Sequence, residues 1–289
     1  MMTKNNNELV SELTKIREIL DNHFSRPQKS VDWNAANAFM WKSEEKNFKP
    51  VENVNAIPLE LLKGIDNNIN LLFENTNNFS KSLPANNALL WGSRGMGKSS
   101  LIKGVHAKIS SSSKNKLILI EIHREDIKDL PDILNELKQS PKENFIVFCD
   151  DLSFDTDDTT YKSLKTALEG GIEGRPKNVI FYATSNRRHL MARQMIENET
   201  STAINPSEAI EEKVSLSDRF GLWIGFHNCS QEQYLSMIQA YAKYYKIPVK
   251  EDELESEAIA WAAGRGSRSG RVAWQFITDF AAKHKINIH

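Results

Sequence analysis

The sequence has little cysteine and no long apolar run. Its only two cysteines, Cys149 and Cys229, stand far apart, and neither has neighbours at metal-ligand spacing. We therefore expect two reduced thiols rather than a disulfide or a metal site. No apolar run is long enough to span a membrane, and Met1 to Asn7 contain no apolar core of a secretory leader. These absences predict a cytoplasmic protein that does not enter membranes.

An excess of charge of either sign is also absent. The 289 residues include 37 Lys plus Arg and 38 Asp plus Glu, for a net charge of −1. Such a balance does not favour nucleic acid or anionic lipid as a partner, and we find no zinc-finger or RNA-recognition motif. The content of 40% hydrophobic and 26% charged residues is ordinary for a globular protein. The length suits one large domain with a smaller one.

What the sequence does contain is a glycine-rich turn between an apolar run and a helical pattern. From Gly92 to Ser99 it fits G-x-x-x-x-G-K-[ST], the phosphate-binding P-loop. Glycines let backbone N–H groups approach phosphate oxygens, and the following helix N-terminus adds partial positive charge. Lys98 is expected to reach the β- and γ-phosphates and the Ser99 hydroxyl to ligate Mg²⁺. The alternative is a turn that binds nothing. The predicted nucleotide-binding residues here are Gly92, Ser93, Arg94, Gly95, Met96, Gly97, Lys98, Ser99 and Ser100.

Apolar runs and helical patterns alternate along the middle of the chain. The runs are rich in β-branched and aromatic residues, which is typical of buried parallel strands. Three helical patterns, at 231–245, 251–263 and 270–284, follow the last run. This order predicts an α/β domain with a five-stranded parallel sheet and a helical C-terminal subdomain. The predicted strands are residues 88–91, 116–123, 145–149, 179–183 and 222–226.

The domain division follows from these patterns. We predict an N-terminal helical extension at 1–55, an α/β nucleotide-binding domain at 56–228 and a helical lid at 229–289. Within the extension, residues 8–24 carry one apolar stripe at helical spacing, and residues 33–41 are predicted to be helical or irregular but packed. Residues 50–58 are predicted to form an extended connector.

Two adjacent carboxylates directly follow the predicted strand at 145–149. Carboxyl ends of parallel strands are where an α/β sheet binds ligands, and Mg²⁺ prefers oxygen ligands. Asp150 is therefore the predicted metal ligand beside Ser99. Asp151 is predicted to orient or deprotonate an attacking water, with capping of the next turn as the alternative.

Together these motifs resemble those of the AAA+ ATPases. Asn186, at the end of the fourth predicted strand, resembles the sensor-1 residue of that superfamily, and SLSDRFG at 215–221 resembles its arginine-finger box. Gly270-Arg271 resembles the sensor-2 motif. The resemblance implies a P-loop NTPase fold, a three-layer sandwich with a five-stranded parallel sheet and a helical lid, which binds ATP and Mg²⁺.

More narrowly, the chain from about Trp41 onward is similar to a family of predicted bacterial AAA+ ATPases catalogued as domain of unknown function 815. Four strings carry this resemblance: NALLWG at 87–92, FCDDLSF at 148–154, ATSNRRHL at 183–190 and LSDRFGLW at 216–223.

The resemblance assigns roles by position. Asn186 would position the attacking water, and Arg219 would reach the γ-phosphate of an adjacent subunit, where a cation stabilises transition-state charge. A surface salt bridge is the alternative for Arg219. Arg271 would couple the lid to the nucleotide, with Arg265 and Arg268 as nearby competitors.

Two further points concern the site. LKGI at 62–65 resembles the segment beside the adenine, where Ile65 would pack on the base, although a simple helix N-terminal turn fits it as well. AAA+ proteins usually have Glu at the position of Asp151. Because Asp is one methylene shorter, we expect hydrolysis to be slow.

The partner is left open by the sequence. Residues 123–128 lack the aromatic residue of a peptide-threading loop, and 169–176 are too short for the hairpin insert of helicase-like relatives. We expect a homo-oligomer that hydrolyses ATP to drive switching or remodelling of an unknown protein partner. A non-hydrolysing nucleotide-dependent interaction module is one alternative, and a nucleic-acid-associated loader or transposition helper is another. The basic cluster of Arg187, Arg188, His189 and Arg193 could contact nucleic acid or acidic residues of a neighbour.

Overall fold

The computed structural model describes residues 12, 14–15, 31–112, 115–154, 160–170, 174–188, 190 and 216–288. The chain divides into two compact units, Met1–Ala35 and Ala36–His289. Most of the helix predicted at 8–24 lies outside the described residues. The second unit contains every strand of the described ranges. No helix in these ranges combines the length and the hydropathy needed to cross a membrane.

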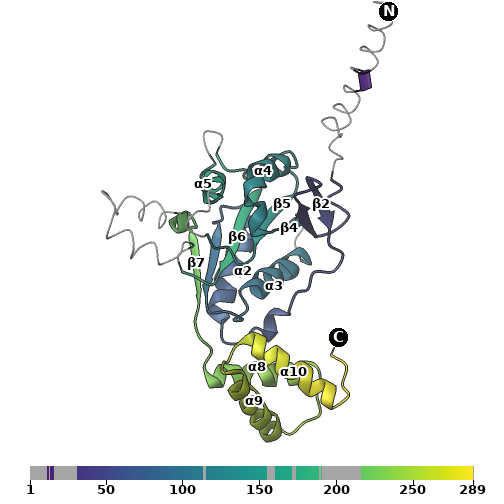
Figure 1. The fold of residues 1–289 in the computed structure, drawn as a ribbon, viewed down its shortest axis with the longest axis vertical. Coiled ribbons are helices and arrows are strands. Elements are labelled where there is room, and N and C mark those ends of the chain that lie inside the picture. Colours follow the sequence, from purple (N-terminus) through teal and green to yellow (C-terminus); the bar gives the residue numbers. More distant parts are fainter. Residues whose placement is uncertain are drawn as a thin grey trace, which may run out of the picture. The chain divides into compact units, whose positions relative to one another are not determined.

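A seven-stranded sheet forms the centre of the second unit (Figure 1). The spatial order is β2-β1-β4-β5-β6-β3-β7, and every neighbouring pair is parallel except β1 and β2. The five predicted strands are all present. The strands are β1 (Ala38–Lys42), β2 (Asn47–Pro50), β3 (Ala88–Gly92), β4 (Leu117–Ile122), β5 (Asn144–Cys149), β6 (Val179–Ser185) and β7 (Leu222–Phe226).

The two additional strands correct the prediction for the N-terminal extension. Residues 38–41, predicted to be helical or irregular, form β1, whose Phe39 pairs with Ile120 of β4. Residues 36–55 therefore belong to the main unit, and the sheet has seven strands rather than five. The stabilising contacts are distant in sequence: Trp41 is 2% exposed, and its indole N–H donates to Asp129 at 3.1 Å. Local periodicity could not reveal them.

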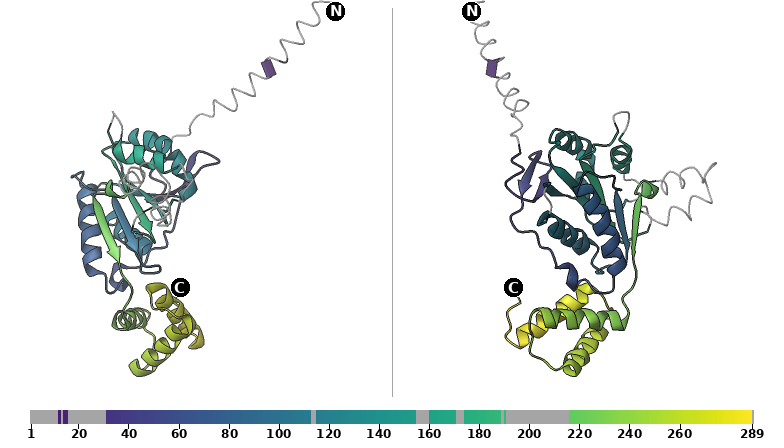
Figure 2. Two further views of the ribbon diagram at one scale, coloured as in Figure 1. Left: turned by 60° about the vertical axis from the view of Figure 1, so that its left-hand side comes forward. Right: turned by 180° about the vertical axis from the view of Figure 1, so that it is seen from behind.

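Helices cover both faces of the sheet, as expected for a three-layer sandwich. Helices α2 (Asp66–Ser80) and α3 (Lys98–Ser110) pack together on one face, and α4 (Leu130–Lys138) and α5 (Tyr161–Glu169) pack together on the other (Figures 1 and 2). All six residues of β5 are buried, because a strand covered on both faces has no solvated side. The predicted α/β sandwich is confirmed.

Three helices follow β7: α8 (Gln231–Tyr244), α9 (Glu251–Arg265) and α10 (Gly270–Lys283). Ser230 and Gln233 form a capping box at the start of α8, and the Ser269 hydroxyl accepts from the Val272 N–H at the start of α10. The structure also contains two short 3-10 helices, η1 (Leu59–Leu61) and η2 (Arg124–Asp129).

A buried histidine makes the stability of this fold depend on pH. The His106 side chain, on α3, is 2% exposed, and its Nε2 lies 3.1 Å from the Leu117 carbonyl oxygen. Burial lowers the pKa of His106 below its ordinary value of 6.5. Below pH 6.5 His106 therefore binds a proton in the unfolded chain but stays neutral in the folded chain until the pH falls further. The free energy of unfolding should fall as pH decreases, by at most about 1.4 kcal/mol per pH unit.

Urea unfolding at pH values between 5 and 8 would measure this dependence. The variant His106→Gln should flatten the pH dependence of the unfolding free energy in the acid range. An unchanged slope in that variant would show that other groups cause the effect.

Candidate nucleotide-binding and hydrolysis site

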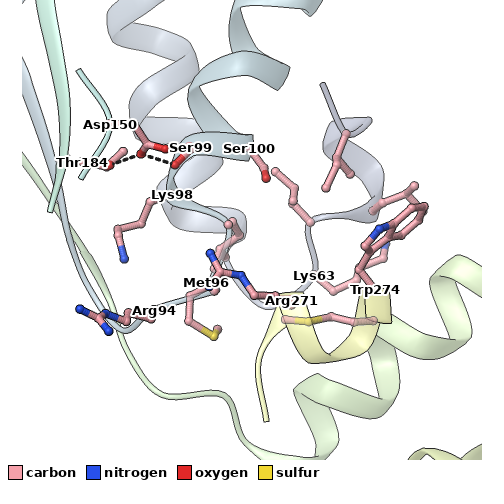
Figure 3. A pocket seen from close by; sticks show the side chains of 18 of the residues that line it. Lys63, Arg94, Met96, Lys98, Ser99, Ser100, Asp150, Thr184, Arg271 and Trp274 are labelled. Carbon is pink, nitrogen blue, oxygen red and sulfur yellow. Dashed lines mark hydrogen bonds between the residues drawn. The ribbon is translucent and has the colours of Figure 1, made fainter. Parts of the chain in front are cut away.

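A cavity of about 620 Å³ lies at the carboxyl ends of the parallel strands, between the P-loop, η1 and the helices that follow β7. Lys98, Asp150 and Thr184 lie at one end of it, and Trp274 lies at the other (Figure 3). The residues that line it are Ile57, Leu61, Leu62, Lys63, Ile65, Arg94, Gly95, Met96, Gly97, Lys98, Ser99, Ser100, Asp150, Asp151, Thr184, Asn186, Met237, Tyr241, Gly270, Arg271 and Trp274.

The P-loop has the strand–turn–helix form that the motif requires. Gly92, Gly95 and Gly97 have backbone φ values of 121°, 72° and 89°, which residues other than glycine rarely adopt. No side chain caps the N-terminus of α3, so its first N–H groups are available to an anion in the cavity. These observations fit a bound phosphate. Gly92 and Ser93 do not line the cavity itself, but their carbonyl oxygens accept hydrogen bonds from Lys98.

Gly92 cannot carry a side chain without moving β7. A Cβ at this position would lie 2.1 Å from the Phe226 carbonyl oxygen, the strand partner of Gly92. We expect Gly92→Ala to destabilise the fold by about 1–3 kcal/mol from backbone strain alone, with the clash in addition. Thermal unfolding would measure a melting temperature several degrees lower. Gly264→Ala is the matched control, because nothing lies within 4 Å of its Cβ; an equal loss in both variants would contradict the prediction.

The Lys98 ammonium lies at the polar end of the cavity. It donates to the carbonyl oxygens of Gly92 at 2.9 Å and Ser93 at 2.8 Å, and to Asn186 Oδ1 at 3.1 Å. Burial lowers the pKa of Lys98, and the nearby carboxylates of Asp151 and Asp150 oppose that shift. The sequence predicted Lys98 and Asn186 separately, and the structure brings them into contact.

Ser99 and Asp150 form the polar pair next to Lys98. The Ser99 hydroxyl donates to Asp150 Oδ1 at 2.6 Å. Hydroxyl and carboxylate oxygens are ligands that Mg²⁺ accepts, so this pair fits the predicted metal site. Thr184, which the sequence analysis missed, also donates to Asp150 Oδ1, at 2.5 Å, and accepts from the Asp151 N–H at 2.9 Å. Thr184 stands two residues before Asn186, at the carboxyl end of β6, and this position is a signal that the sequence contained.

Asp151 adopts an unusual backbone conformation. Its φ is +51°, rare for a non-glycine residue, and its Oδ1 accepts from Asn186 Nδ2 at 2.5 Å. Lys98, Asn186 and Asp151 thus form one continuous hydrogen-bonded chain. Strain of this kind persists where the surrounding structure fixes it, and here the Thr184 hydroxyl and carbonyl hold the turn.

We expect Thr184→Val to lower phosphate release by about 10–100-fold, because a hydrogen bond to a charged group contributes about 1.5–3 kcal/mol. Valine has the same shape but cannot donate to Asp150 or accept from Asp151. Nucleotide affinity without Mg²⁺ should stay the same, and the Mg²⁺ concentration for half-maximal activity should rise. Thr184→Ser should retain activity. Equal losses in the valine and serine variants would contradict a role for the hydroxyl.

The other end of the cavity, next to Trp274, is lined by several apolar side chains. Ile65 is buried and lines it, and so do three residues that the sequence analysis missed: Met237, Tyr241 and Trp274. Met237 and Tyr241 share one face of α8, and the rings of Tyr241 and Trp274 lie 5.4 Å apart. Their contribution depends on how the three C-terminal helices pack, which periodicity does not give.

Arg271 lines the cavity, whereas Arg265 and Arg268 do not. The Arg271 N–H donates to the Gly95 carbonyl oxygen at 3.0 Å, which joins α10 directly to the P-loop. Arg265 stacks on Trp261, with its guanidinium 5.0 Å from the ring centroid. Of the three candidates for the lid arginine, the geometry places only Arg271 where a nucleotide could contact it.

Arg219 is a predicted catalytic residue, and it does not line the cavity. Its side chain is paired with Glu169 at the end of α5, with Nε 2.6 Å from Oε1. The surface salt bridge considered as an alternative is therefore present. Ser215 of the same motif, and His189 and Arg193 of the basic cluster, lie outside the described residues.

A family described as "Protein of unknown function (DUF815)" matches residues 34–284. The chain belongs to this family. The resemblance found in the four sequence strings is thereby confirmed. None of the curated proteins matches this DUF815 member.

Solved structures similar to the DUF815 chain include the RuvB Holliday junction branch migration motor of Thermotoga maritima, with 17% identity and a TM-score of 0.53; the match covers 79% of this chain and 66% of RuvB. The ORC2 protein of Aeropyrum pernix in ADPNP-ADP complexes has 13% identity and a TM-score of 0.50, covering 78% and 70%. The ORC1 protein of the same organism in complex with DNA has 12% identity and a TM-score of 0.50, covering 78% and 62%. The DUF815 chain thus has the AAA+ P-loop fold and spans just under two thirds of RuvB.

Proposed function

We propose that the chain is a Mg²⁺-dependent ATPase of the AAA+ type. The observation that carries the proposal is the hydrogen-bonded chain of Lys98, Asn186 and Asp151 next to the Ser99–Asp150 pair, at the P-loop end of the cavity. A phosphate-binding loop, oxygen ligands for a cation and a carboxylate that can accept a proton are the parts that phosphoanhydride hydrolysis requires.

Each residue has a role in this proposal. Lys98 binds the β- and γ-phosphates, Asn186 orients the attacking water, and Asp151 accepts its proton. Ser99 and Asp150 would hold Mg²⁺, which neutralises phosphate charge when bound. Arg271 contacts the nucleotide from α10, and the apolar end with Ile65 receives the base. The P-loop residues Gly92, Ser93, Arg94, Gly95, Met96, Gly97 and Ser100 shape the phosphate cradle.

The active form in this proposal is an assembly of copies of the chain. Arg219 does not line its own chain's cavity, so its proposed role requires the nucleotide of an adjacent copy. ATP turnover would then change how the copies, or an unidentified protein partner, pack against each other. Residues 123–128, which contain no aromatic residue, lie at the start of and within η2, where Ile127 is fully buried.

The test is phosphate release by the purified chain with saturating Mg²⁺ and ATP, measured beside binding of a fluorescent ATP analogue. Steady release by the parent that Lys98→Ala abolishes, with reduced binding, would support the proposal. Release equal in parent and variant would reveal a contaminating ATPase and refute it.

A non-hydrolysing nucleotide-dependent module is the second candidate, and the shorter Asp151 in place of Glu favours it. In that case ligand affinity alone shifts a conformational equilibrium. The same measurements separate the two, because the module would bind the analogue and release no phosphate.

A nucleic-acid-associated role is the third candidate. Two of the similar structures are a Holliday junction branch migration motor and a protein in complex with DNA. Arg187 and Arg188 are exposed and could contact phosphates. Retention of the chain on DNA that weakens with salt and is lost in Arg187→Glu would support this role, whereas retention unchanged by Arg187→Glu would refute it.

A further inference from the structure

A second cavity of about 490 Å³ adjoins the nucleotide cavity on the side of Arg94 and Asn186. We call it the arginine groove. Arg94 and Asn186 line both cavities, so an occupant of the groove and a nucleotide would share two side chains. The groove is lined by Trp91, Gly92, Ser93, Arg94, Asn186, Arg187, Arg188, Phe226, His227 and Asn228.

The charge of the arginine groove is of one sign. Arg94, Arg187 and Arg188 line it, and no carboxylate does. Among the residues that the structure describes, none forms an ion pair with these three arginines. All three are exposed. The groove therefore offers several cationic donors to an anion that the described chain does not itself provide.

Arg188 is held in place rather than extended at random. Its guanidinium lies 5.2 Å from the centroid of the Trp91 ring, a cation–π contact. The Trp91 ring has room because residue 225 is glycine: a Cβ added there would lie 3.0 Å from the ring. The His227 ring lies edge-on to Trp91, with the two ring centroids 6.2 Å apart. A cation fixed before binding loses less entropy when it binds an anion.

The complementary charge lies beside Arg219. Glu169 is half exposed and pairs with Arg219 at 2.6 Å, and the exposed Asp218 precedes Arg219 in the chain. If Arg219 of one copy enters the site of another, as the proposed function requires, Glu169 travels with it. If Arg219 leaves Glu169 to meet a phosphate, this half-exposed carboxylate becomes available to another cation.

We propose that the arginine groove is a docking surface for a second copy of this chain, and that Glu169 of that copy pairs with Arg188 there. The ion pair within one chain, Glu169 with Arg219, is exchanged for two across the interface: Glu169 with Arg188 and Arg219 with the γ-phosphate. The inference rests on the proposed function, because it assumes that Arg219 acts in a neighbouring site. It adds the residues that recognise the neighbour.

Nucleic acid is the other anion with the right chemistry for the groove. Two observations favour the second copy. The groove shares Arg94 and Asn186 with the nucleotide cavity, so a polyanion there would be repelled by the triphosphate of ATP. The chain as a whole carries a net charge of −1, which gives no long-range attraction for a polyanion.

The experiment uses two full-length chains that are each inactive alone. The site donor carries Arg219→Ala and keeps its nucleotide cavity. The finger donor carries Lys98→Ala and keeps Arg219. Their mixture should release phosphate, because the finger donor completes the site donor's cavity. A mixture without activity would refute the shared site of the proposed function, and the groove inference with it.

Charge reversals in the active mixture then test the arginine groove alone. Arg188→Glu in the site donor, or Glu169→Lys in the finger donor, should each lower phosphate release at least ~10-fold. The same reversals placed in the opposite chain should have no such effect. Arg188→Glu in the site donor combined with Glu169→Lys in the finger donor should restore most of the activity, because the ion pair is rebuilt with its charges exchanged. Lys177→Glu and Glu74→Lys are matched controls at exposed positions outside the groove.

Two results in an active mixture would overturn the docking proposal and leave the shared site intact. In one, the reversals have equal effects in either chain; in the other, the double reversal restores no activity. The docking proposal would also be overturned, in favour of nucleic acid, if Arg188→Glu abolished retention of the chain on a single-stranded oligonucleotide but left the activity of the mixture unchanged.

Discussion

Asp151→Asn is expected to abolish steady phosphate release while nucleotide binding persists. The Asp151 carboxylate is exposed at the cavity and accepts from Asn186 Nδ2 at 2.5 Å, so it is held by a residue that Lys98 also contacts. Asparagine has the same shape but cannot take a proton from water. General-base catalysis contributes on the order of 10²–10⁴-fold, and we expect a loss of this size in kcat. Binding should persist because Lys98, Ser99 and Asp150 are unchanged.

Phosphate release and binding of a fluorescent ATP analogue, measured on the same preparations, check this prediction. Asp252→Asn is a matched control on the exposed start of α9. Asp151→Glu is the informative second variant. Because the backbone at Asp151 has φ +51° and brings the short side chain to Asn186, the longer glutamate should lower activity rather than raise it. Activity retained in Asp151→Asn would remove Asp151 from catalysis, whereas binding without phosphate release in the parent itself would support the non-hydrolysing module.

Much of the fold could be predicted because its signals are local. The strands from β3 to β7 are apolar runs with β-branched residues, and the predicted starts at Ala88, Val179 and Leu222 agree with the structure. Strand β1 was missed for the opposite reason. Phe39 and Trp41 show no alternation strong enough to indicate a strand, and they are held by pairing with β4 and by Asp129, some 90 positions away.

The polar half of the candidate site follows from motifs, and the apolar half does not. Lys98, Ser99 and Asp150 sit at fixed offsets from a strand end, so the order of strand, turn and helix brings them together. Trp274 and Tyr241 reach the cavity only because α8 and α10 pack against each other. The pairing of Glu169 with Arg219 joins residues 50 positions apart, and no spacing rule connects them.

Arg219→Ala is expected to abolish ATP turnover without weakening ATP binding. The residue does not line the cavity of its own chain, so a direct effect on binding has no structural basis. An arginine that reaches the transferred phosphate from outside raises kcat by on the order of 10³–10⁵-fold, because it stabilises charge that develops only in the transition state. Loss of Arg219 should therefore lower kcat and leave the dissociation constant for ATP unchanged.

Protein concentration supplies the independent readout for Arg219. If each cavity is completed by a neighbour, the specific activity of the parent must rise with concentration, since dilution separates the copies. Arg219→Ala should show no activity at any concentration, and Arg265→Ala, whose guanidinium stacks on Trp261 away from the cavity, should behave as the parent. Activity that is independent of concentration, together with a silent Arg219→Ala, would mean that each chain hydrolyses ATP alone. Arg219 would then serve only as the partner of Glu169, and the exposed charges of the arginine groove would need another ligand.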